Sequence, residues 1–254
     1  MNHLILQLKC NGMANSWFRF KGFLIEQANS PLKVCTDACL FGAWIATVIQ
    51  GEHRNHPVSV LDIGTGTGLL TLMVAQKNPK AKLVAIELNT AAASDADKNF
   101  NSSDFQKNIT LVEGDINTFR PERQFDFILS NPPFFENDLK SPDAGRSSAM
   151  HVETLSMEAL ALAIDQNVTV NGKAAVLLAF RSIRFEKLME KRGWFVEELI
   201  TVKQTPGHTP FRKMILFQKN KETAAKTAEL TIKNSNAIYS PEFIALLKDY
   251  YLYL

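Results

Sequence analysis

Cysteine is scarce in this sequence, which has only Cys10, Cys35 and Cys39 among its 254 residues. Three clustered cysteines cannot build a disulfide framework, and this favours a reducing compartment such as the cytoplasm. Cys35 and Cys39 have no third or fourth ligand close to them in the sequence, so no zinc site or other metal site is expected.

Long apolar runs and a strong charge imbalance are also missing. No run approaches the roughly 20 residues of a membrane span, so no membrane insertion is expected. The net charge of +2 argues against general polyanion binding and leaves room for a local basic patch. A content of 46% hydrophobic and 21% charged residues is ordinary for a globular chain with one large core.

The opening twelve residues lack the basic start and the cleavage site of a signal peptide. Met13 begins a segment, "MANSWFRFKGF", that reads like a natural start. We therefore expect an upstream extension over 1–12, an N-terminal lid segment over 13–50 and the main domain over 51–254. A monomer is expected.

Apolar β-branched runs alternate with helical patterns from about residue 57. This alternation predicts an α/β fold with a Rossmann-like, doubly wound, mostly parallel sheet. Only a loop joins the last two strands, so that pair is expected to be antiparallel. Helix caps are expected at Thr36, Thr90 and Ser240. The seven expected strands are 58–64, 81–88, 109–115, 125–130, 172–180, 195–203 and 213–220.

Three glycines, Gly64, Gly66 and Gly68, lie between an expected strand and an expected helix, just after Asp62. Glycine allows close approach of the backbone to a ligand. The G-x-G-x-G spacing differs from the G-x-G-x-x-G of dinucleotide-binding enzymes. It resembles motif I of the class I S-adenosylmethionine-dependent methyltransferases, which implies S-adenosyl-L-methionine as cofactor. The alternative is a glycine-rich turn without a ligand.

Acidic residues follow the next two strands. Glu87 ends one of them, where a carboxylate is suited to accept hydrogen bonds from both ribose hydroxyls. Asp115 follows the next strand and is expected to reach the adenine amino group of the cofactor, with Ile116 packed on the ring; an exposed turn aspartate is the alternative. Ligands of open α/β sheets bind outside these carboxyl ends.

The fourth strand ends in Asn131, Pro132, Pro133 and Phe134. Proline must stop a strand, because it has no N–H and a fixed φ. The stretch resembles motif IV, [D/N/S]-P-P-[Y/F/W], of methyltransferases that modify conjugated amino groups. This resemblance implies that the Asn131 side-chain oxygen and the Pro132 carbonyl accept the amino protons, while Phe134 stacks on the planar target and Pro133 stiffens the turn.

Three longer stretches carry a more specific resemblance: "FRFKGFLIEQANSPLKVCTDACLFGAWI", "SNPPFFENDLKSPDAGRSSAMH" and "YSPEFIALLKDYYLYL". They are similar to the bacterial tRNA(Val) adenine 6-amino methyltransferases. The resemblance implies methylation of an adenine beside the anticodon of a valine tRNA, with Thr36 and Asp37 at the methionine tail of the cofactor. Cys35 and Leu32 depart from the family pattern, in which glycine and methionine are usual.

Other readings remain open: a guanine 2-amino methyltransferase of rRNA, a glutamine-amide methyltransferase of release factors, and a non-enzymatic cofactor-binding regulator. The intact Asn131–Phe134 motif argues against the regulator. A tRNA target needs phosphate contacts and a splayed base, and the loop 136–152 is expected to order on RNA binding. The candidate phosphate contacts are Arg19, Lys21, Lys140, Arg146, Arg181, Arg184, Lys203, Arg212 and Lys213.

Overall fold

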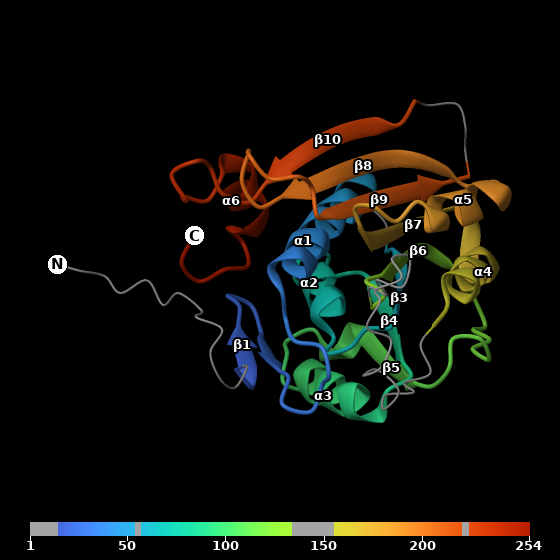
Figure 1. The fold of residues 1–254 in the computed structure, drawn as a ribbon. Coiled ribbons are helices and arrows are strands. Elements are labelled where there is room, and N and C mark those ends of the chain that lie inside the picture. Colours follow the sequence, from blue (N-terminus) through green and yellow to red (C-terminus); the bar gives the residue numbers. More distant parts are fainter. Residues whose placement is uncertain (1–14, 54–56, 134–154, 220–223) are drawn as a thin grey trace, which may run out of the picture.

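The computed structural model describes residues 15–53, 57–133, 155–219 and 224–254 (Figure 1). The expected extension over 1–12, Phe134 and the loop 136–152 lie outside these ranges. Within them, no helix combines the length and the apolar character that crossing a membrane requires.

An eight-stranded sheet forms the centre of the protein, in the order β10-β8-β9-β7-β6-β3-β4-β5. Strand β9 runs antiparallel to β7 and β8, and every other neighbouring pair is parallel. The expected α/β class and the antiparallel pair are therefore confirmed. The strands are β3 (Ser59–Ile63), β4 (Lys82–Glu87), β5 (Ile109–Glu113), β6 (Phe125–Ser130), β7 (Val168–Ala179), β8 (Phe195–Lys203), β9 (Arg212–Gln218) and β10 (Lys226–Thr231).

The sheet has one strand more than the seven expected. The additional strand, β10, pairs with β8 at one edge of the sheet. Its first four residues are exposed and Leu230 is its only buried residue, so its sequence lacks the apolar run of a central strand. An edge strand exposed on both faces gives little periodic signal.

Helices cover both faces of the sheet (Figure 1). One apolar core joins one face of the sheet to α1, α2, α3 and α6, and a second core joins the other face to α4 and α5. Gly42 allows α1 to approach α2, because a Cβ there would lie 2.6 Å from Met73 Sδ. The helices are α1 (Thr36–Glu52), α2 (Leu69–Lys77), α3 (Thr90–Asn101), α4 (Met157–Asn167), α5 (Arg184–Lys191) and α6 (Pro241–Leu247), with a short 3₁₀ turn at Gln106–Asn108.

A small hairpin of β1 (Trp17–Arg19) and β2 (Leu24–Glu26) precedes α1. Phe18 and Phe20 turn inward toward Tyr251 near the C-terminus, with ring centroids 5.9 Å from it. The two ends of the described chain therefore pack together.

Two of the three expected helix caps are wrong by one residue. Helix α1 begins with Cys35 as its N-cap, without a side-chain cap bond, so Thr36 is its first helical residue. Helix α3 is capped by Asn89, whose side chain accepts from Ala92 N at 2.9 Å. Asparagine is a better cap than threonine, and this explains the shift. The Ser240 cap of α6 is confirmed by its bond from Phe243 N.

Candidate active site

The carboxyl ends of β3, β4, β5 and β6 bring most of the expected residues to one edge of the sheet. In the sheet register, Ile63 at the end of β3 pairs with Ile86 of β4 and with Ser130 of β6. Gly114 N donates to Glu87 O at 2.9 Å, which joins the loop after β5 to the end of β4. Parallel neighbouring strands therefore place the acidic and amide side chains in a row at this edge.

Asp62 is buried beneath the glycine loop, with 1% of its surface exposed. Its Oδ2 accepts hydrogen bonds of 2.7 Å from both Thr65 Oγ1 and Thr71 Oγ1. Its Oδ1 is buried and has no partner among the described residues. Burial raises the pKa of Asp62 to about 6, although the threonine hydrogen bonds oppose the rise.

Glu87 holds the glycine loop through backbone hydrogen bonds. Its Oε2 accepts from Gly66 N at 2.8 Å, and its Oε1 accepts from Asn89 N at 2.9 Å. Gly64, Gly66 and Gly68 have φ values of 70°, 59° and 82°, in the left-handed region that favours glycine. The loop is thus held by the same carboxylate that the sequence assigns to the ribose.

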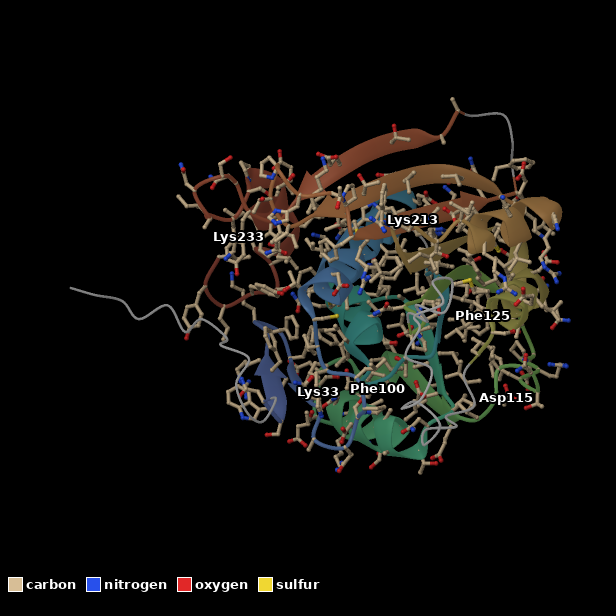
Figure 2. The ribbon with its side chains drawn as sticks, in the orientation of Figure 1. Lys33, Phe100, Asp115, Phe125, Lys213 and Lys233 are labelled. Atoms are coloured by element: carbon tan, nitrogen blue, oxygen red, sulfur yellow. The ribbon has the colours of Figure 1, made fainter. Side chains whose placement is uncertain are left out.

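Gly68 also lies against a side chain of α3. A Cβ added there would lie 2.4 Å from Cε1 of Phe100, a residue labelled in Figure 2. Only glycine therefore fits between this turn and the ring. In contrast to Gly68, Gly64 and Gly66 border open space, because a Cβ at either position would meet nothing within 4 Å. This open side leaves room for a ligand.

Asp115 lies in the loop after β5 (Figure 2), where its Oδ1 accepts hydrogen bonds from the backbone N and side-chain Nδ2 of Asn117. This local turn accounts for one carboxylate oxygen and leaves the other for a ligand. Ile116 beside it is 6% exposed and packs into the core on the α4 side of the sheet. The turn fixes the Asp115 side chain at the edge of the sheet, where β3 and β4 lie between β5 and the β6 strand that leads to Asn131.

Asn131 follows β6 and is half-buried. Its Oδ1 is buried and accepts no hydrogen bond from the described residues. The preceding Ser130 is held in place, since its Oγ donates to Ile63 O at 2.9 Å. Pro132 is half-buried and Pro133 exposed. A buried amide oxygen without a donor is costly unless a ligand supplies one.

The start of α1 lies beside the last residue of β7 and the first residue of β9. Asp37 is 7% exposed, and its Oδ2 accepts from Arg212 Nε at 2.7 Å. Arg212 begins β9 opposite Ala179, the last residue of β7. Asp37 is therefore paired within the protein, while Thr36 next to it is exposed.

Sequence reasoning missed two buried polar residues of α3 that connect the hairpin to the glycine loop. Asn99 bonds both backbone groups of Glu26, and its Nδ2 also donates to Thr67 O at 2.9 Å. Asp95 accepts from the backbone N atoms of Asn29 and Ser30 at 2.9 and 2.8 Å. Their four-residue spacing on an otherwise apolar helix face was the available signal.

Several candidate phosphate contacts turn out to have partners within the protein. Lys203 pairs with Glu229, and Arg184 with Glu158. Lys213, labelled in Figure 2, is 4% exposed and binds Glu186 and the carbonyl of Ser182, which removes it from direct contact with RNA. Lys21 donates to Lys248 O. Lys140 and Arg146 lie outside the described residues. Over the described ranges, no group of three or more acidic, histidine or cysteine side chains could hold a metal ion.

Strand order, glycine loop and the row of polar residues together define a class I S-adenosyl-L-methionine-dependent methyltransferase. Solved structures share the fold: a predicted O-methyltransferase from Agrobacterium tumefaciens has a TM-score of 0.60 at 17% identity and covers 84% of this chain and 96% of its own. A putative class I methyltransferase from Listeria monocytogenes has a TM-score of 0.58 at 14% identity and covers 84% of this chain and 71% of its own. The family model described as "Methyltransferase small domain" matches residues 46–162.

The family follows from relatives that align over almost the whole chain. A protein of Bacteroides thetaiotaomicron is 36% identical, over 95% of this chain and 100% of its own. A protein of Dyadobacter fermentans is 35% identical, over 94% of this chain and 98% of its own. A protein of Vibrio vulnificus is 33% identical, over 96% of this chain and 99% of its own. All three are named tRNA1(Val) (adenine(37)-N6)-methyltransferase. The chain belongs to this family, which confirms the resemblance found in its sequence.

Proposed function

We propose that this protein transfers a methyl group from S-adenosyl-L-methionine to the 6-amino group of the adenine at position 37 of a valine tRNA. The observation that carries the proposal is Asn131 Oδ1, a buried acceptor without a donor among the described residues. It follows β6, which pairs with the strand β3 that contains Asp62; β3 pairs in turn with β4, which ends in Glu87. The names of the relatives support the choice of tRNA and of adenine.

The cofactor side of the site would use the ends of β3, β4 and β5. Glu87 would accept hydrogen bonds from the ribose, and the backbone at Gly64 and Gly66 would lie against the ligand because no side chain fills that space. Asp115 and Ile116 would contact the adenine ring, and Thr36 with Asp37 the methionine tail. The cofactor supplies an electrophilic methyl group; the residues of this chain bind and orient it.

The substrate side would use the Asn131 motif. The lone pair of an adenine 6-amino nitrogen is delocalised into the ring, so the nitrogen is a poor nucleophile. Asn131 Oδ1 and the Pro132 carbonyl would each accept one N–H of the amino group, and Phe134 would stack on the base. Two fixed acceptors localise the lone pair and direct the nitrogen toward the methyl group. As the C–N bond forms, the bond between the methyl group and the cofactor's sulfur would break and its electron pair would stay on sulfur. The nitrogen would become positively charged and would then release one proton to water.

The proposal includes the organisation of the chain. The segment 13–50 would close over the cofactor, because residues 26–30 are fastened to α3 next to the glycine loop. The remainder, 51–254, would form the methyltransferase domain. We further propose a cytoplasmic monomer, which suits an enzyme that acts on one tRNA at a time. Light scattering of the purified protein tests the monomer.

The experiment that tests the function is methyl transfer from labelled cofactor to three substrates in parallel: unmodified total tRNA, rRNA and a release factor. Nucleoside mass spectrometry identifies the product. Label in tRNA as 6-methyladenosine supports the proposal. Label in rRNA as 2-methylguanosine, or in the release factor, would keep the fold and cofactor and replace the substrate.

A further inference from the structure

Helix α5 has a basic face outside the site described above. Phe185 and Met189 are buried against the sheet, whereas Arg184, Lys187 and Lys191 are exposed. Spacings of three and four residues place these three cations on one side of the helix. We call Arg184, Lys187 and Lys191, together with the exposed Arg181 just ahead of the helix, the α5 basic face.

The acidic residues of the region reduce this charge only in part. Glu186 turns inward to the buried Lys213, so its charge is neutralised beneath the surface. Glu158 of α4 accepts from Arg184 Nη2 at 2.6 Å and offsets that one cation. Glu190 is exposed on the Glu186 side of the helix. In the described part of the chain, Lys187 and Lys191 form no ion pair.

The α5 basic face begins at the edge of the sheet where Asn131 lies. The chain leaves β7 at Ala179, forms a short turn and enters α5 at Arg184. Strand β7 pairs with β6 through Val176 and Ser130, so this turn is a neighbour of Asn131. The turn is fixed to β9, because buried Lys213 donates a hydrogen bond to the carbonyl of Ser182.

A hollow of about 400 Å³ lies between α4 and α5, which run on the same side of the sheet (Figure 1). Exposed Ile183 and half-buried Leu188 contribute apolar surface to it, among the lysines. Cations beside apolar surface suit a strand of nucleic acid, whose phosphates need charge and whose sugars need contact area. The residues that line it are Glu158, Ile183, Arg184, Lys187, Leu188 and Lys191.

We propose that the α5 basic face binds the phosphate backbone of the tRNA whose adenine enters the site; this rests on the proposed function for its substrate. From Arg184 to Lys191 the helix rises about 10 Å, which spans a few consecutive phosphates of one strand. A target inside a folded RNA must be splayed out, and contacts to the flanking backbone hold the rest of the RNA in place meanwhile. The overall charge of +2 is too small to attract RNA to the whole surface, so the α5 basic face would supply the positive charge locally.

The test compares two double variants that remove the same charge from two different regions of the molecule, one beside β7 and β8 and the other beside β4 and β5. Lys187→Gln/Lys191→Gln alters the α5 basic face. Lys80→Gln/Lys107→Gln alters exposed lysines just before β4 and β5, at the amino ends of the strands. The affinity for the valine tRNA is measured at several salt concentrations, together with cofactor affinity, melting temperature and turnover at saturating tRNA.

The α5 variant is expected to bind tRNA about 10-fold more weakly at low salt. The slope of log affinity against log salt should fall by about 1 to 2, since each phosphate contact contributes about 0.7 to 0.9. Its cofactor affinity, melting temperature and saturated turnover should match the wild type. The control variant should lie within about 2-fold of the wild type in tRNA affinity.

Two results overturn the inference, and they differ. If the wild type methylates tRNA and the α5 variant behaves like the control variant, the α5 basic face is not the binding surface and the proposed function stands. If the wild type neither binds nor methylates tRNA, the proposed function fails, and the inference fails with it.

Discussion

The two halves of the proposed site differ in how many of their polar atoms are already hydrogen-bonded within the protein. At the ends of β3 and β4, three of the four carboxylate oxygens of Asp62 and Glu87 already accept hydrogen bonds from the protein. At the end of β6, Asn131 Oδ1 accepts none from the described residues. Under the proposed function, the protein would fix most of the cofactor half in advance, with Asp62 Oδ1 as the exception, and the ligand would complete the substrate half.

This difference has a physical reason. A cofactor present at every turnover benefits from a rigid loop, since ordering it beforehand lowers the cost of binding. An acceptor meant for the amino group of the substrate must be free until the substrate arrives. Under the proposed function, a correctly bound base would remove the cost of the unpartnered buried oxygen.

Asn131→Ala is expected to have the largest effect and would break the comparison on its substrate side. Turnover should fall by about 100-fold to 1,000-fold, the usual loss when one fixed group that stabilises the transition state is removed. The affinity for the cofactor should stay within about 2-fold, because Asn131 is not assigned to it. Single-turnover kinetics and calorimetry check the two quantities; weak cofactor binding with normal turnover would contradict the assignment.

Asp62→Asn tests the cofactor half of the site through the pH dependence of protein stability. A carboxyl whose pKa rises from 3.8 to about 6 on folding keeps its proton in the native state after the unfolded chain has released it. The stability of the wild type therefore falls as pH rises from about 4 to 6, by roughly 2 to 3 kcal/mol at 1.36 kcal/mol per unit.

Asparagine does not titrate and keeps an acceptor for Thr65 and Thr71. The free energy of unfolding of Asp62→Asn, minus that of the wild type, should therefore increase between pH 4 and pH 6 and level off above pH 7. Urea unfolding at four pH values measures this difference. A difference that stays constant with pH would mean that folding does not change the pKa of Asp62.

Glu87→Ala is expected to weaken cofactor binding by about 10-fold to 100-fold, because hydrogen bonds to a charged group contribute about 1.5 to 3 kcal/mol. The variant loses the proposed ribose contacts and also the bond from Gly66 N. Turnover at saturating cofactor should change much less. Glu87→Gln keeps one acceptor, so its cofactor affinity should lie between those of Glu87→Ala and the wild type. Equal cofactor affinity in all three proteins would remove Glu87 from the ribose role.

Gly68→Ala is expected to have the smallest effect and tests the fit of the glycine loop. Its φ of 82° and the 2.4 Å approach to the Phe100 ring should cost about 1 to 2 kcal/mol of stability. Gly51→Ala is the matched control, since a Cβ there meets nothing within 4 Å and α1 continues through it. Thermal unfolding should show a loss for the first variant and none for the second.

Local signals were enough to find seven of the eight strands of the main sheet and the residues that end them. Runs such as "FDFIL" and "VSVLDIG" are apolar enough to require burial, so the ends of β3 and β6 followed, and with them Asp62 and Asn131. Strand β10 escaped because an exposed edge strand needs no apolar run. The cap of α3 was displaced by one residue, since Asn89 and Thr90 are both suitable caps.

Partners far apart in the sequence could not be predicted. Asp37 and Arg212 are separated by 175 residues, and Asn99 and Glu26 by 73. Such pairs depend on how α1 and α3 pack beside the sheet, and no local pattern specifies that. Lys213 shows the same limit: its sequence neighbours suggested a surface cation, whereas the fold buries it against Glu186.

The central claim is tested most directly with two valine tRNA transcripts that differ only at position 37, adenine in one and guanine in the other. Each is treated with the enzyme and labelled S-adenosyl-L-methionine and then analysed by nucleoside mass spectrometry. The account predicts about one methyl group per adenine-37 transcript, as 6-methyladenosine, and none in the guanine-37 transcript. Equal labelling of both transcripts, or a methylated guanosine, would contradict it.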